Sequence, residues 1–177
     1  VPTVSAPQGN VTLRAGDGIN LPAGSLVTAD TDSGGQVRMQ VDHDGVGGND
    51  PDNNVGAVIA IHGNVEAETV VIEGGANLDF IQLFSGINAN GETTLRGHGS
   101  DDRFFVQRIA GKTKLQGDAG ADRYHIASNA SKAVFTNNGV FKDAPTSASD
   151  TFDSLDVLTG TLQHIKGVLT VAPGVGG

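Results

Sequence analysis

Short runs in which apolar and polar residues alternate recur along this chain, separated by clusters of Gly, Asp and Asn. Apolar residues recur two positions apart as Phe104 and Val106 in one run and as Tyr124 and Ile126 in another. In a β-strand, side chains two positions apart point to the same face. The pattern therefore predicts many short strands with one face directed inward.

Further strands of this kind are expected at seven other places. They are residues 11–13, 19–21, 26–28, 37–41, 57–61, 69–72 and 168–171. The segments between them are rich in residues that favour turns. An all-β fold follows from this distribution.

Two segments superimpose with a period of 20 residues, 94–106 on 114–126. In this alignment Leu95 matches Leu115, Phe104 matches Tyr124, and an Asp follows a Gly in both copies. A fainter copy, residues 72–83, lies 23 residues upstream. Each copy is expected to form a short strand, a tight glycine turn, an Asp and a second short strand.

Such repeats predict a right-handed parallel β-helix, a partly irregular solenoid with coils of about 20 residues. One coil cannot cover its own inner face, whereas stacked coils share a continuous core. An antiparallel sandwich would also supply many short strands, but it would not explain the 20-residue period. The whole chain, 1–177, is expected to form one β-helical domain cut from a longer protein, with an acidic loop at 42–56 and an insertion at 129–160.

The glycine turns resemble the nonapeptide Gly-Gly-x-Gly-x-Asp-x-apolar of RTX-type (repeats-in-toxin) calcium-binding β-rolls. Degenerate copies occupy residues 74–81, 97–104 and 117–124. The surrounding sequence is similar to the Gly/Asp-rich tracts of large bacterial proteins that are secreted or attached to the cell surface. The resemblance implies calcium between successive turns, held by backbone carbonyls and by Asp79, Asp102 and Asp122. Family repeats recur every nine residues, whereas one motif per coil here would let calcium line only one edge.

Calcium binds six to eight oxygen ligands, and glycine turns leave carbonyl oxygens accessible. Asp101 and Asp118 flank the column formed by the three implied ligands and are further candidate ligands. The alternative is that each Asp accepts backbone N–H groups in its turn. Arg103 and Arg123 follow two of the column residues, and their charges could neutralise the column and make a metal unnecessary.

The acidic loop at 42–56 is a second candidate calcium site. It supplies Asp42, Asp44, Asp50 and Asp52 beside several Asn residues. Its beginning is similar to the first positions of an EF-hand loop, but the later Glu of that motif is missing. A solvated acidic loop is the alternative interpretation.

Composition narrows the function classes further. The net charge of −9 disfavours nucleic acid and anionic membranes as partners. The absence of Cys excludes disulfides, a thiol nucleophile and a cysteine-rich zinc site. No apolar stretch reaches the roughly 20 residues of a membrane-spanning helix.

The sequence therefore predicts a non-catalytic, calcium-binding structural or adhesive segment at the cell surface or outside the cell. Its expected partners are calcium ions, surface glycans or neighbouring repeats of the parent chain. A polysaccharide lyase or epimerase is the alternative, with His98 and the Asp101–Asp102 pair as acid and base. A carbohydrate-binding module is a third possibility, although the chain has few aromatic residues.

Overall fold

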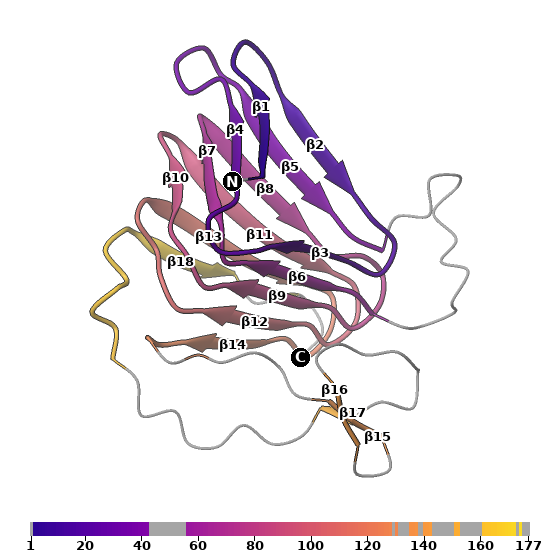
Figure 1. The fold of residues 1–177 in the computed structure, drawn as a ribbon. Coiled ribbons are helices and arrows are strands. Elements are labelled where there is room, and N and C mark those ends of the chain that lie inside the picture. The colour runs from indigo at the N-terminus through magenta and orange to yellow at the C-terminus, as the bar shows by residue number, and fades with distance from the viewer. Residues whose placement is uncertain are drawn as a thin grey trace.

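The computed structural model describes residues 2–42, 56–128, 130, 161–172 and 174, and the backbone of three short strands at 135–137, 140–142 and 151–152. This part of the chain is all-β and contains no helix. Three parallel sheets, which we name A, B and C, contain the strands of the main body (Figure 1). The predicted all-β class is confirmed.

Each sheet consists of short strands that come from successive passages of the chain. Sheet A contains, in spatial order, β1 (Thr3–Ala6), β4 (Leu26–Ala29), β7 (Asn64–Ala67) and β10 (Ile87–Ala89). Sheet B contains β18 (Leu169–Ala172), β13 (Lys112–Asp118), β11 (Glu92–His98), β8 (Thr69–Glu73), β5 (Gln36–Gln40) and β2 (Val11–Arg14). Sheet C contains β14 (Arg123–Ile126), β12 (Arg103–Val106), β9 (Phe80–Leu83), β6 (Val58–Ile61) and β3 (Gly18–Leu21).

The chain passes through the three sheets in the same sequence several times. It follows β1, β2 and β3, then β4, β5 and β6, then β7, β8 and β9, then β10, β11 and β12. Every pairing within sheets A, B and C is parallel. We call each such passage a winding. Parallel pairing rules out the antiparallel sandwich for this body.

The register between windings follows the sequence repeats. Leu95 pairs with Leu115 and Phe104 with Tyr124, as the 20-residue period predicts. Ile72 pairs with Leu95, which confirms the 23-residue offset of the fainter copy. Like residues align because a one-residue slip would turn every inward side chain outward.

The core consists of the inward side chains of successive windings. In sheet B the buried row contains Met39, Ile72, Leu95 and Leu115, each with no exposed area. The rings of Phe104 and Tyr124 stack across windings at 4.9 Å. Burying a large apolar side chain contributes about 1.5–3 kcal/mol, so these rows stabilise the stacking along its whole length.

The structure differs from the expected repeat in two ways. Sheet A was largely missed, because β7 and β10 have only three or four residues and direct small or isolated apolar side chains inward. The repeat glycines Gly97 and Gly117 lie inside β11 and β13, not in the turns that follow. At both positions the missing side chain makes room for a carboxyl group of the same winding.

Two segments expected to depart from the repeat lie mainly outside the described residues, namely 43–55 and most of 129–160. Within the second, β15 (Phe135–Asn137), β16 (Val140–Lys142) and β17 (Thr151–Phe152) form a small antiparallel sheet. The Ser128 amide donates to the Thr161 carbonyl at 2.8 Å, so the chain leaves and rejoins the main body at one place. Beyond it, β18 pairs with β13.

The two larger sheets differ in what their outer faces expose. In sheet C, every residue of β9 and β12 is buried. In sheet B, buried residues alternate with partly or fully exposed polar residues along β5, β11 and β13. Sheet B is therefore the broad, accessible polar face.

Candidate functional site

The polar groups predicted to matter lie where the chain passes from sheet B to sheet C. The turns after β8, β11 and β13 carry Asp79, Asp102 and Asp122, one in each of three adjacent windings. Because β9, β12 and β14 pair in register, these carboxylates form a single file. The file is the arrangement that the sequence repeats predict.

Each carboxylate in the file accepts a backbone N–H from the preceding winding. Asp79 Oδ1 accepts the Ala57 amide at 2.8 Å, and Asp102 Oδ1 accepts the Asp79 amide at 2.8 Å. Asp122 Oδ1 accepts the Asp102 amide at 3.0 Å. The file thus joins neighbouring windings directly, a role beyond the capping of its own turn that the sequence suggested.

A glycine five positions before each Asp makes room for its second oxygen. A Cβ added at Gly74, Gly97 or Gly117 would lie well inside 3.0 Å of the Oδ2 atom of the Asp in the same winding. Any other residue would displace the carboxyl group. The recurring Gly-x4-Asp spacing is therefore a packing requirement of the file.

Burial gives Asp102 an unusual charge state. Asp102 has no exposed area, and its Oδ2 atom, like that of Asp122, is buried without a hydrogen-bond partner. Loss of hydration raises the pKa of Asp102 to about 9; the Asp79 amide opposes this shift, and the charges of Asp79 and Asp122 add to it. Asp102 is therefore protonated at neutral pH.

Arg103 binds the carbonyl oxygens of the same turns. Its Nη1 donates to the carbonyls of Asp101 at 2.7 Å, Asp102 at 3.0 Å and Ala121 at 3.4 Å. Only 8% of Arg103 is exposed, and burial, followed by the charge of Arg123, lowers its pKa. A guanidinium group thus engages carbonyls that the RTX resemblance would assign to calcium.

The remaining predicted ligands lie apart from this file. Asp101 Oδ1 accepts the Ala121 amide at 2.8 Å, and Asp42 Oδ2 accepts the Ala76 amide at 3.0 Å. Asp118 faces Arg96 on sheet B. Asp44, Asp50 and Asp52 lie outside the described residues.

Among the residues that the structure does describe, no group of three or more His, Asp or Glu side chains could hold a metal ion. In the file, at least one oxygen of each carboxylate already accepts an amide. Calcium binding, at this edge and in the acidic loop, stays a prediction.

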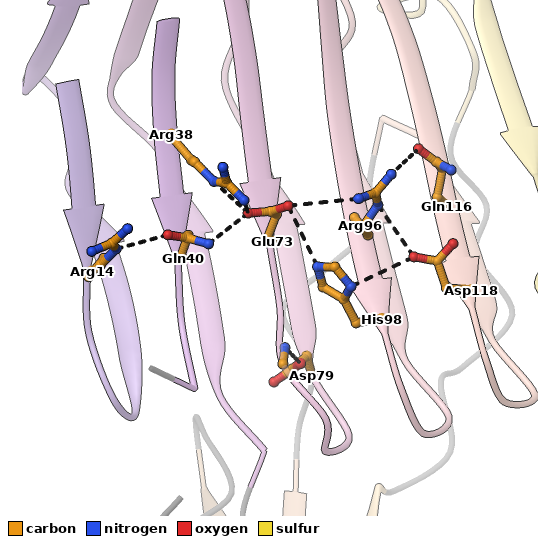
Figure 2. Close-up of polar contacts among 10 residues, drawn as sticks. Arg14, Arg38, Gln40, Glu73, Asp79, Arg96, His98, Gln116 and Asp118 are labelled. Atoms are coloured by element: carbon orange, nitrogen blue, oxygen red, sulfur yellow. Dashed lines mark hydrogen bonds and ion pairs between the residues drawn. The ribbon is translucent and has the colours of Figure 1, made fainter. Parts of the chain in front are cut away.

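A second polar cluster, not predicted from the sequence, centres on Glu73 in sheet B (Figure 2). The Glu73 carboxylate is 4% exposed and accepts Arg38 Nε at 2.7 Å and Gln40 Nε2 at 2.9 Å. Arg38 Nη2 lies 2.6 Å from the same oxygen. Glu73, Arg96 and Gln116 occupy one register position in adjacent strands, so the 23- and 20-residue offsets could have revealed this row.

The other side of Glu73 faces Arg96 and His98. Glu73 Oε1 lies 3.9 Å from Arg96 Nη1 and 3.6 Å from His98 Nε2. Asp118 Oδ2 lies 3.3 Å from Arg96 Nε and 3.9 Å from His98 Nδ1. Figure 2 shows these side chains as one polar chain that crosses the strands of sheet B.

His98 and Asp118 pair in register and both have left-handed backbone, with φ of 81° and 69°. Such backbone is uncommon for residues other than Gly and is concentrated at turns and functional sites. Asp118 lies beside Arg96, and His98 lies between Glu73 and Asp118. Of the groups predicted as acid and base, His98 and the Asp101–Asp102 pair, Asp102 has no exposed area and is closed to substrate.

Substituting Glu73→Gln is expected to destabilise the fold by about 1.5 kcal/mol, because the buried carboxylate accepts charge-assisted hydrogen bonds from Arg38. Urea unfolding at neutral pH measures the change. Glu92→Gln is the matched control, since Glu92 pairs with the exposed Lys112 at 2.8 Å and should cost less than about 0.5 kcal/mol. Equal losses in both variants would contradict a special role for Glu73.

No helix in the described ranges is long and apolar enough to cross a membrane. Comparison with known proteins finds no matching family model, no matching curated protein and no matching solved structure. Function must therefore be inferred from the geometry of the windings and of their polar groups.

Proposed function

We propose that the chain is a right-handed parallel β-helix that serves as a non-catalytic structural or adhesive segment of a larger protein, secreted or held at the cell surface. The observation that carries this proposal is the in-register stacking of successive windings in three parallel sheets. Sequence features agree with it: Gly/Asp-rich repeats similar to those of large bacterial surface proteins, and no cysteine.

Two arrangements support a non-catalytic role. Asp102, one of the candidate acids, is buried and bonded to the Asp79 amide, so it belongs to the scaffold. His98 lies between Glu73 and Asp118, and no described contact joins it to Asp101 or Asp102. Asp102 and His98 thus both contact other groups of the protein in ways that stabilise the fold.

The windings are joined at the edge between sheets B and C by protein groups. Asp carboxylates accept amides of the neighbouring winding, and Arg103 reaches carbonyls of two windings, Asp102 in its own and Ala121 in the next. We therefore propose that this edge is stable without calcium. Calcium, if bound, is assigned to the acidic loop at 42–56.

Thermal unfolding in chelator and in calcium tests the proposal. The transition temperature is expected to change by less than about 2 °C between excess EGTA and about 5 mM calcium in the variant Asp44→Asn/Asp52→Asn, which lacks two predicted loop ligands. That concentration exceeds the dissociation constants of about 0.1–1 mM typical of extracellular calcium modules, so a site in the file would be filled and would stabilise the fold.

The wild-type protein is the matched comparison. A calcium-dependent shift that disappears in the loop variant would assign the ion to the loop. A chain that is unfolded in EGTA, or a shift that survives in the loop variant and is abolished by Asp102→Asn, would contradict a metal-independent edge. Turnover of an acidic polysaccharide that is lost in His98→Ala would contradict the non-catalytic role.

A further inference from the structure

Basic side chains are concentrated on the outer face of sheet B. This face carries five of the eleven basic residues in the chain, namely Arg14, Arg38, Arg96, Lys112 and Lys114. Its strands carry three carboxylates, Glu73, Glu92 and Asp118. The face is therefore net positive on a chain whose net charge is −9.

Neighbouring strands hold the guanidinium groups in place. Gln40 accepts Arg14 Nε at 2.9 Å, and Glu73 accepts Arg38 Nε at 2.7 Å. Both Nη atoms of Arg14, and Nη1 of Arg38, donate to no residue that the structure describes. Each group is thus oriented through one side and can donate to a ligand through the other, which lowers the entropy cost of binding.

The basic side chains are distributed across several strands of sheet B and do not form one compact cluster. Arg14, Arg38, Arg96 and Lys114 come from four strands of the sheet, in the order β2, β5, β11 and β13, with β8 between the second and third. At about 4.8 Å per strand, the series spans on the order of 19 Å. Thr12, Thr94 and Gln116 lie between or beside them and offer hydroxyl and amide groups.

These features match a linear chain that carries spaced carboxylates and many hydroxyl groups. Arginine binds carboxylate oxygens through paired N–H donors. Nucleic acid fits less well, because no strand of sheet B has a Phe, Tyr or Trp on which bases could stack. A neutral glycan would leave Arg14, for which the described residues provide no ion pair, without a counter-charge.

We infer that the outer face of sheet B binds an acidic polysaccharide of the uronic acid class, with Arg14, Arg38 and Lys114 contacting its carboxylates while Arg96 stays paired with Glu73 and Asp118. This inference rests on the proposed adhesive role and names its ligand class. The binding surface lies across the windings, perpendicular to their strands (Figure 2). It uses the polar row centred on Glu73 as a support for the arginines.

Isothermal titration of the full chain with oligogalacturonate at low ionic strength tests the inference. The methyl ester of the same oligomer, which has no carboxylate charge, is expected not to bind. The variant Arg14→Gln/Lys114→Gln removes two cations that hold no buried group and is expected to weaken binding about tenfold. Arg108→Gln/Lys166→Gln is the control, because it removes the same charge from exposed positions outside sheet B and should change affinity less than about twofold.

Absence of wild-type binding, or equal binding of the methyl ester, would overturn the inference. If both double variants reduced the affinity for oligogalacturonate equally, the effect would be one of general charge, and the inference would be overturned. Tighter binding of single-stranded DNA than of oligogalacturonate would also overturn it. Circular dichroism of each variant establishes that it is folded. Failure of glycan binding in a folded, EGTA-resistant chain would leave the proposed structural role intact.

Discussion

Gly97→Ala is expected to lower the free energy of unfolding by about 3 kcal/mol. The new Cβ would lie well inside 3.0 Å of Asp102 Oδ2 and 2.9 Å from the Gly117 carbonyl oxygen. The Asp102 carboxyl group cannot move aside without losing the Asp79 amide, and the neighbouring strand cannot move without breaking the pairing of β11 with β13. Urea unfolding followed by circular dichroism measures the loss.

Gly16→Ala is the matched control, since Gly16 lies at the corresponding edge of the first winding and has no atom within 4 Å of an added Cβ. Its effect should stay within about 0.5 kcal/mol. If the two alanine variants were equally stable, the glycines would not be making room for the Asp file, and the explanation of the Gly-x4-Asp spacing would be wrong.

Asp102→Asn is expected to make the protein more stable at alkaline pH and to remove much of the pH dependence of its stability. Because burial raises the pKa of Asp102 to about 9 in the folded protein, the native state retains a proton that the unfolded state releases near pH 4. The stabilisation from this group is therefore complete below about pH 4 and is lost as pH rises toward about 9. Asn keeps an Oδ1 acceptor for the Asp79 amide and cannot ionise.

Between pH 5 and pH 8, the free energy of unfolding of the wild type should fall by up to about 4 kcal/mol relative to that of Asp102→Asn. Chemical unfolding at a series of pH values measures it. Asp17→Asn, at an exposed turn position of the first winding, should leave the pH profile unchanged. Parallel profiles for wild type and Asp102→Asn would show that the buried carboxyl group ionises as easily in the folded chain as in the unfolded one.

The sequence predicts the stacking of windings best where like residues recur at a constant spacing. The 20-residue offset aligned Leu95 with Leu115 and Phe104 with Tyr124, and both pairs occur. Sheet A was harder to predict, because β10 contributes one large apolar side chain, Ile87, to the buried core. A three-residue strand carries too few positions for a period of two to be seen.

For the candidate site, the sequence predicts that Asp79, Asp102 and Asp122 are stacked, but it does not predict which groups form hydrogen bonds with them. The partner of Asp102 Oδ1 is the amide of Asp79, 23 residues earlier, and backbone partners leave no signature in residue types. The resemblance to calcium-binding repeats implies that the turn carbonyls bind a metal ion, whereas in the structure Arg103 donates to three of these carbonyls. The Glu73 cluster was missed because Arg38 lies 35 residues before Glu73, in a winding lengthened by the acidic loop.

The distance along the chain between paired residues varies widely, although the pairing itself does not. Val37 pairs with Val11, 26 positions earlier, and with Val70, 33 positions later, while Thr93 and Thr113 are only 20 apart. The extra residues lie between strands. Each winding therefore offers the same strands for pairing with the next winding, however many residues it contains. A molecule built in this way can gain or lose whole layers during evolution without a change in cross-section, and its surface can diversify while the axis stays constant.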